Sequence, residues 1–247
     1  TIFRPAITES AVSYPLPGWN EGLNTSGPLL YFMGTWYRQL PARNDKVLDV
    51  IPVDICCASL TASGAALLNR VHQPVYQCAT SHLNPLPMSR ALELTSLGHR
   101  RHYRKNGNGP VERVVLSRWD GQLVDEDHFM RIENIRGLVR RVGAGLKDLP
   151  KGVPTALRSR ANKMASESER VDRRLNILEK VIDTYKPFVL RTPQVYVTSN
   201  LAELSLSEKH FEFRPQDLDW RRYWIRVHLP GLRRWSFPVI ENRRVEN

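Results

Sequence analysis

The chain has 247 residues, of which 41% are hydrophobic and 25% charged, so it has the composition of a globular protein and enough length for a core. No apolar run approaches the roughly 20 residues of a membrane span, and the first residues do not resemble a signal peptide. Three cysteines, Cys56, Cys57 and Cys78, are too few and wrongly spaced for a disulfide framework or a zinc site. We therefore expect a reducing, cytoplasmic compartment.

The net charge is the one unusual bulk property. It is +11, with an isoelectric point near 9.9. Such a charge favours an acidic partner, which is a nucleic acid, an anionic membrane surface or a coenzyme with several phosphates. A solvated basic surface without a partner remains the alternative.

The chain begins with a strand end and a long loop. Residues 2–7 resemble the end of a strand that Pro5 turns into a loop, and the start in mid-pattern leads us to expect a fragment of a longer protein. Residues 14–28 are dense in Pro, Gly and Asn, which is typical of a functional or mobile loop. Its Trp19 is either an anchor that faces a ligand or a side chain packed on the core, and packing is the commoner fate.

Residues 45–68 form the unit around which the chain is organised. After the aromatic residues 29–40, which predict a short helix, residues 47–53 predict an apolar strand. Asp54 stands where a helix N-cap belongs, and residues 55–68 carry no charge. A helix that is apolar all round is expected to be buried, so this stretch predicts one βα unit inside the molecule.

The next elements lead to the clearest break in the chain. Residues 74–79 predict a strand, residues 80–87 a loop, and Pro87 opens a helix to about Tyr103 whose last turn is strongly basic, where the helix dipole favours cations. Residues 106–110, Asn-Gly-Asn-Gly-Pro, follow, and we place a domain boundary there.

Beyond this boundary the pattern is mostly helical. Residues 128–142 and 155–185 have helical periodicity, and Pro187 is expected to end the second helix. Residues 211–238 interleave aromatic side chains with arginines, which suits a membrane interface, stacking on nucleic acid, or a helix that docks its aromatic face while its arginines reach water. We expect docking, with membrane contact as the next alternative.

Motifs of catalysis and cofactor binding are absent from the printed sequence. It contains no G-x-G-x-x-G turn, no P-loop, no G-x-S-x-G elbow and no Tyr with a Lys four residues later. The seven histidines show no metal-ligand pairing on one helix face. We therefore identify no catalytic residue and no metal site in this chain.

Several stretches are more specific than composition. In chain order they are Arg4-Pro5-Ala6-Ile7, Pro17-Gly18-Trp19, Ile51-Pro52-Val53-Asp54, residues 74–86, and Phe213, Asp219-Trp220, Tyr223 and His228-Leu229-Pro230-Gly231-Leu232. In this order they resemble the second half of the alcohol-forming fatty acyl-CoA reductases of the bacterial type, which belong to the extended short-chain dehydrogenases/reductases. Each motif is short, but together they cover most of the chain.

The resemblance implies an α/β fold, in which the substrate half of a Rossmann-type reductase domain (residues 1–106) precedes a mostly helical C-terminal domain (residues 107–247). It implies NADPH-dependent reduction of a fatty acyl-CoA, through an aldehyde, to a fatty alcohol. It places Arg4, Pro5, Ala6 and Ile7 beside the nicotinamide and Pro17, Gly18 and Trp19 on the acyl side, with Asp54 as a structural cap.

The family's glycine-rich turn and Tyr-x-x-x-Lys pair precede the Arg-Pro strand and are not in this chain. In that chemistry the Lys lowers the pKa of the Tyr, which protonates the oxyanion. We therefore expect this chain to be inactive alone. The competing hypothesis is a non-enzymatic basic module that binds nucleic acid or an anionic membrane.

Overall fold

The computed structural model describes residues 1–21, 26–34, 38–107, 109–124, 132–147, 154–190, 194–204, 211 and 213–241. The chain forms two compact units. Unit 1 comprises Thr1–Val124 and Val189–Asn247, and unit 2 is Asp125–Phe188. Both ends of the chain thus belong to one unit, whereas the division predicted from the sequence lies at residue 106. The two units are compact parts of the chain and are not themselves domains of known function. The predicted division into residues 1–106 and 107–247 stays a prediction.

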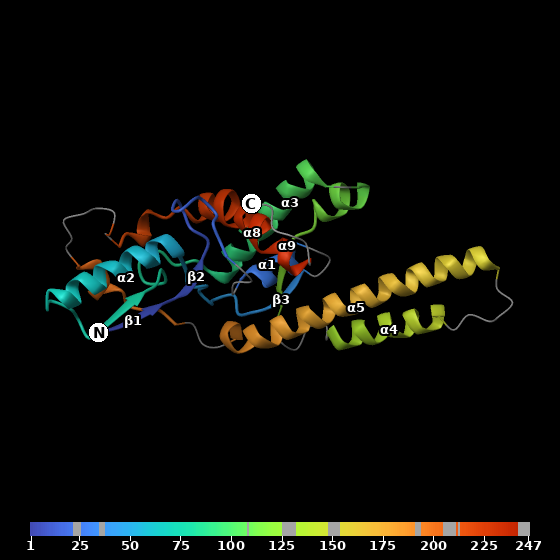
Figure 1. The fold of residues 1–247 in the computed structure, drawn as a ribbon, viewed down its shortest axis with the longest axis horizontal. Helices are drawn as coiled ribbons and strands as arrows, with labels where there is room; N and C mark the ends of the chain where they lie inside the picture. Colours follow the sequence, from blue (N-terminus) through green and yellow to red (C-terminus); the bar gives the residue numbers. More distant parts are fainter. Residues whose placement is uncertain are drawn as a thin grey trace. The chain divides into compact units, whose positions relative to one another are not determined.

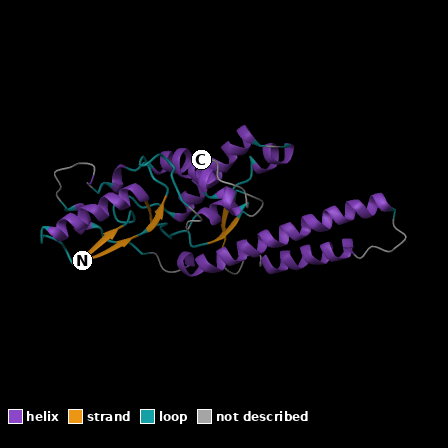
Figure 2. Ribbon diagram, in the orientation of Figure 1, coloured by secondary structure: helices purple, strands orange, loops and turns teal. Residues whose placement is uncertain are grey.

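Short parallel strands define the class of unit 1 (Figures 1 and 2). β1 (Ile2–Pro5) pairs with β5 (Val75–Cys78), β2 (Ile7–Glu9) with β4 (Val50–Pro52), and β3 (Gln39–Pro41) with β6 (Gln122–Val124). All three pairs are parallel, which requires crossover connections. The expected α/β class is confirmed as a mixture of helices and parallel strands.

The βα unit predicted at residues 45–68 is present, with differences in its details. β4 leads into α2 (Val53–Leu68), but the N-cap residue is Pro52, without a side-chain cap, and Asp54 lies in the first helical turn. The small side chains of α2 face the strands, and Cys56, Ser59, Ala62, Ser63 and Ala66 are buried. Leu60 and Leu68 on the other side are 51% and 85% exposed, so the expectation of burial all round was wrong. Absence of charge allowed burial but did not require it.

The predicted helix after Pro87 is confirmed as α3 (Met88–Asn106), which packs against the C-terminal segments. The aromatic residues 29–40 divide between α1 (Gly27–Met33) and β3, and the π-helical η1 (Val111–Leu116) follows α3. A hydrophobic cluster of Met33, Leu40, Ala42, Met88 and Leu92 joins α1, β3 and α3.

The C-terminal part of unit 1 consists of short helical segments. They are α6 (Ser199–Ala202), η4 (Pro215–Asp217), α7 (Trp220–Arg222), η5 (Tyr223–His228), α8 (Leu229–Trp235) and α9 (Phe237–Ile240). Tyr223, Trp224 and Phe237 are at most 7% exposed, so the docking of the aromatic face is confirmed. A second cluster, of Ile51, Cys56, Tyr76, Cys78, Leu201 and Phe213, joins α6 to β4, α2 and β5.

In unit 2, the described residues form two helices. α4 is Ile132–Lys147, and α5 begins at Thr155 as predicted but runs to Leu190, past Pro187. Of the predicted face of α5, Leu178 and Ile182 are buried, whereas Val171 is 42% exposed. The predicted start of α4 at His128 lies outside the described residues.

Within the described parts of the chain, no helix has the length and apolarity needed to cross a membrane. The same residues contain no cluster of acidic, histidine or cysteine side chains fit to hold a metal ion.

Candidate functional site

The predicted nicotinamide-side segment lies where β1 gives way to β2. Arg4 and Pro5 are exposed, and Ala6 and Ile7 are half-buried. The N–H of Ala6 donates to the carbonyl of Cys78 in β5, and the N–H of Ile7 donates to the carbonyl of Asp49, which precedes β4. The segment is therefore bonded first to β5 and then to the residue before β4. A cofactor that reached this segment would meet an exposed arginine and fixed backbone.

The predicted acyl-side residues Pro17, Gly18 and Trp19 belong to a loop that closes on itself. The N–H of Ala11 donates to the carbonyl of Trp19 at 3.0 Å, and the N–H of Gly18 donates to the carbonyl of Ala11 at 2.9 Å. Trp19 is half-buried and Pro17 exposed. The loop, residues 11–19, therefore has a fixed base and an exposed tip.

Asp54 holds this loop against the start of α2. Its carboxylate accepts hydrogen bonds from the N–H groups of Val12, Ser13 and Tyr14 at 3.0, 2.8 and 3.2 Å. It also accepts one from the N–H of Ile55 at 3.2 Å. Bonds from several N–H groups to one carboxylate are charge-assisted and strong. Asp54 is structural, as expected, but it anchors a distant loop in place of capping its own helix.

Gly18 brings the loop into contact with α8. Its φ is +81°, and a Cβ built on it would lie 2.8 Å from the carbonyl oxygen of Val227 and 3.0 Å from the Cα of Gly231. A Cβ built on Gly231 would lie 2.0 Å from the carbonyl oxygen of Gly18. The two backbones touch, and neither position has room for a side chain. The Pro17-Gly18-Trp19 and His228–Leu232 motifs, far apart in sequence, therefore meet in space.

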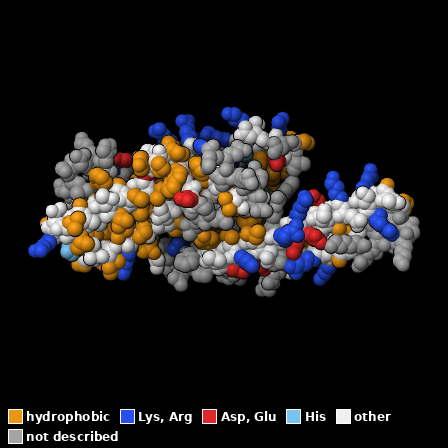
Figure 3. Space-filling model, viewed as in Figure 1, with side chains coloured by type: hydrophobic (Ala, Val, Ile, Leu, Met, Phe, Trp, Pro, Cys, Tyr) orange, Lys and Arg blue, Asp and Glu red, His pale blue; other side chains and the backbone are white. Residues whose placement is uncertain are grey.

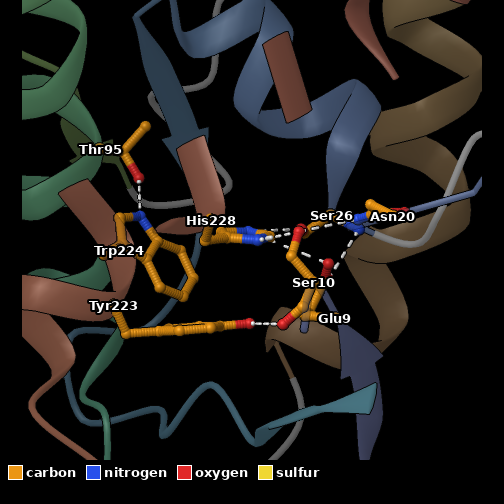
Figure 4. A network of polar contacts seen from close by, with 8 residues as sticks. All are labelled: Glu9, Ser10, Asn20, Ser26, Thr95, Tyr223, Trp224 and His228. Atoms are coloured by element: carbon orange, nitrogen blue, oxygen red, sulfur yellow. Dashed lines mark hydrogen bonds and ion pairs between the residues drawn. The ribbon is translucent and has the colours of Figure 1, made fainter. Parts of the chain in front are cut away.

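A buried polar network lies beneath this contact (Figure 4). Asn20 Nδ2 donates to Ser10 Oγ at 3.1 Å, and Ser10 Oγ lies 3.0 Å from Nδ1 of His228. On the other side of the imidazole, Nε2 lies 3.5 Å from Ser26 Oγ. The network thus ties both ends of the loop, Ser10 and Asn20, to the last residue of η5.

Aromatic rings enclose the imidazole of His228. The ring of Tyr223 stacks on it at 5.6 Å between centroids, and the ring of Trp224 lies at 4.8 Å. The hydroxyl of Tyr223 donates to the carbonyl of Ser10, and Trp224 Nε1 donates to Thr95 Oγ1. These bonds satisfy the polar ends of both aromatic side chains inside the core.

Burial changes the acid–base properties of the network. Glu9 is 1% exposed, and burial raises the pKa of its carboxyl from 4.5 to about 7, although bonds from Ser26 favour the charged form. Burial lowers the pKa of His228 from 6.5 to about 3, so this imidazole is neutral at pH 7. Glu9 Oε2 lies 3.9 Å from Nε2 of His228 and has no hydrogen-bond partner among the described residues. Neither group is compensated by a close opposite charge, and desolvation dominates.

A second buried histidine joins α1, α3 and α8. His99 Nε2 lies 2.9 Å from the carbonyl oxygen of Leu30, and Nδ1 lies 3.0 Å from the guanidinium of Arg233. Burial, together with the charge of Arg233, lowers the pKa of His99 well below its usual value. This neutral imidazole has a structural role, since it donates through Nε2 to the carbonyl of Leu30 and accepts from Arg233 at Nδ1.

Sequence reasoning identified the loop but missed the residues that hold it. Glu9, Ser10 and Asn20 were not singled out, and His228 appeared only as part of a motif. The one local signal was a glutamate followed by a serine directly after an apolar strand segment, which is an unusual place for a carboxyl.

Three curated proteins similar to the chain are all fatty acyl-CoA reductases. No family model matches the chain. It is 26% identical over 245 residues to the probable fatty acyl-CoA reductase 4 of Arabidopsis thaliana, which covers 94% of this chain and 46% of the relative. It is 25% identical over 244 residues to the fatty acyl-CoA reductase 8 of the same plant, and 24% identical over 248 residues to the alcohol-forming fatty acyl-CoA reductase of Simmondsia chinensis, with the same coverage.

The chain spans about half the length of the curated relatives it matches. These relatives come from plants, and the bacterial type named from the motifs stays a prediction. The similarity runs along nearly the whole chain and supports a reductase-like relationship at family level.

Proposed function

We propose that this chain is part of an NADPH-dependent reductase that converts a fatty acyl-CoA, through an aldehyde, to a fatty alcohol. The observation that carries the proposal is similarity to curated fatty acyl-CoA reductases over 94% of the chain. The contact between the Gly18 loop and α8 supports it, because two motifs taken from the resemblance form one structural unit.

The proposed roles follow the resemblance. Arg4, Pro5, Ala6 and Ile7 lie beside the nicotinamide, and Pro17, Gly18 and Trp19 line the acyl side. Residues 1–106 form the substrate half of a Rossmann-type domain, and residues 107–247 form the C-terminal domain. The bacterial type and a cytoplasmic location belong to the same proposal.

The described residues do not fit a whole dinucleotide. The two long helices of unit 1, α2 and α3, each begin after a proline and not after a glycine-rich turn, so neither offers the open backbone that a pyrophosphate requires. NADPH, which supplies hydride, would therefore be held mostly by residues that this chain does not contain. We propose that the chain alone does not reduce acyl-CoA.

The test separates binding from turnover. Purified chain is mixed with NADPH and acyl-CoA of increasing chain length, and NADPH absorbance is followed. We expect no oxidation above the rate without protein, and steady turnover would contradict the proposed inactivity.

Binding of the same acyl-CoA series is measured by calorimetry. Affinity should rise with chain length, by up to about 0.8 kcal/mol for each buried CH₂. Trp19→Ala should weaken this dependence, whereas Trp119→Ala, on a 40% exposed tryptophan elsewhere in unit 1, should leave it intact. Affinity independent of chain length would remove the acyl-side assignment.

The competing function is a non-enzymatic basic module. It is favoured by the many arginines that the docked C-terminal segment leaves exposed. A nucleic-acid binder would lose affinity steeply and linearly in a log–log plot against salt concentration. The acyl series at fixed salt distinguishes the two functions.

A further inference from the structure

Around η5, the C-terminal segment buries two aromatic side chains and exposes three arginines. Tyr223 and Trp224 are buried, whereas Arg221, Arg222 and Arg226 are exposed. The buried rings are therefore not available for stacking on nucleic-acid bases, nor for insertion between lipids. The exposed arginines remain available to a partner.

The neighbouring helix adds to this charge. α3 packs against η5, with Trp224 bonded to Thr95, and its last two turns carry further exposed cations. We call the whole set the basic ridge, and it consists of Arg101, Arg104, Lys105, Arg221, Arg222, Arg226 and Arg234. In Figure 3, Lys and Arg side chains gather along the upper edge of the view, over the C-terminal helices and α3.

The acidic side chains that the structure describes form no ion pair with the basic ridge. None of its seven residues makes an ion pair with any residue that the structure describes. Asp219, the acid nearest to its start, is occupied as the N-cap of α7, where it accepts from the N–H of Arg222. Uncompensated like charges raise the energy of the free protein, and an anionic partner would relieve this repulsion.

The loop that carries Gly18 contacts the segment that contains Arg226 and has an apolar tip. Gly18, at the base of the loop, lies against the backbone of Val227, the residue that follows Arg226, so the loop meets η5 next to one residue of the basic ridge. At this tip Tyr14 is 77% exposed and Leu16 is 37% exposed. An exposed tyrosine and an exposed leucine on a loop held against an arginine-bearing segment suit the boundary between lipid head groups and acyl chains.

We propose that the basic ridge and the tip of the Gly18 loop form the surface on which this protein docks to an anionic phospholipid bilayer. The ridge extends along several elements, which suits an extended charged surface. The loop tip enters the head-group layer, so the proposed acyl-side loop faces the phase into which long acyl chains partition. This docking does not depend on reductase activity, and it is tested without it.

The test uses the whole chain and sedimentation with vesicles of phosphatidylcholine, with or without phosphatidylserine. Binding should require phosphatidylserine and should weaken as salt is added. The variant Arg222→Glu/Arg226→Glu should lower the partition coefficient about thirtyfold or more, because two cations are lost and two anions gained. Tyr14→Ser should reduce the part of the binding that survives high salt.

The matched control is Arg160→Glu/Lys163→Glu on α5, which changes the net charge equally at exposed positions of unit 2. Binding of this control should fall by no more than about threefold. Equal losses in both variants, or binding to phosphatidylcholine alone, would overturn the proposal. So would tighter binding of an oligonucleotide that displaces the vesicles, and matching thermal unfolding curves exclude misfolding as a cause.

Discussion

The buried carboxyl of Glu9 should make the free energy of unfolding of unit 1 fall as pH rises, and Glu9→Gln should remove this fall. Its pKa is about 7 in the folded chain and near 4.5 in the unfolded chain. Between these values the folded state keeps a proton that the unfolded state has lost, so stability falls as pH rises and is constant above about pH 7. At about 1.4 kcal/mol for each pH unit, the loss amounts to roughly 3 kcal/mol.

His228 contributes the opposite slope. Its pKa is about 3 in the folded chain and near 6.5 when unfolded, so the unfolded state takes up a proton first and stability falls as pH drops from 6.5. Between pH 4.5 and 6.5 the unfolded chain holds a charged carboxyl and a charged imidazole, and the folded chain holds both neutral. The numbers of bound protons are equal, so the two slopes cancel in this window.

Glu9→Gln removes the fall in stability with rising pH that Glu9 causes and leaves the rise that His228 causes. The variant should match the native chain at pH 4.5, its advantage over the native chain should grow by about 1.4 kcal/mol for each unit up to about pH 7, and it should exceed the native chain by roughly 3 kcal/mol at pH 8. The assay is urea unfolding followed by tryptophan fluorescence at several pH values. Glu21→Gln, at an exposed position of the same unit, is the control and should show no such gain. A stability difference that does not change with pH would refute the reasoning.

Two further substitutions test how the loop is held. Gly18→Ala should lower the melting temperature, because its positive φ costs a residue with a Cβ about 1–2 kcal/mol and the Cβ would also strike the backbone of η5 and α8; Gly64→Ala, in the open middle of α2, should raise it, and equal shifts would contradict the close contact. Asp54→Asn should speed hydrogen exchange at residues 12–14 and lower stability by about 1–2 kcal/mol, because charge-assisted bonds to three N–H groups are weakened. Unchanged exchange there would show that the loop does not depend on this carboxylate.

Local patterns predicted several elements correctly. The strand and helix at residues 50–68 and the helix after Pro87 follow from apolar runs and breakers that act over a few residues. The docking of Trp224 was expected because a ring of that size is seldom left in water. These predictions required only local information or a strong preference for burial.

The misassigned features depended on distant partners. Asp54 has the right chemistry for an N-cap, and the same acceptor oxygens serve a loop about 40 residues upstream equally well. The helix α2 lacks charge on all sides, yet only the side that meets the strands is buried. The altered pKa of Glu9 could not be derived from the sequence, because a carboxyl acquires such a pKa only when its surroundings exclude water.

The sequence by itself determined the positions of the main helices and strands, the excess of positive charge and the resemblance to the acyl-CoA reductases, because each depends on composition or on the order of neighbouring residues. Only the tertiary structure decided that Gly18 touches Gly231 and that His228 joins both ends of the loop. Such contacts join residues more than 200 positions apart, and they form because packing selects which surfaces meet, which no local periodicity specifies.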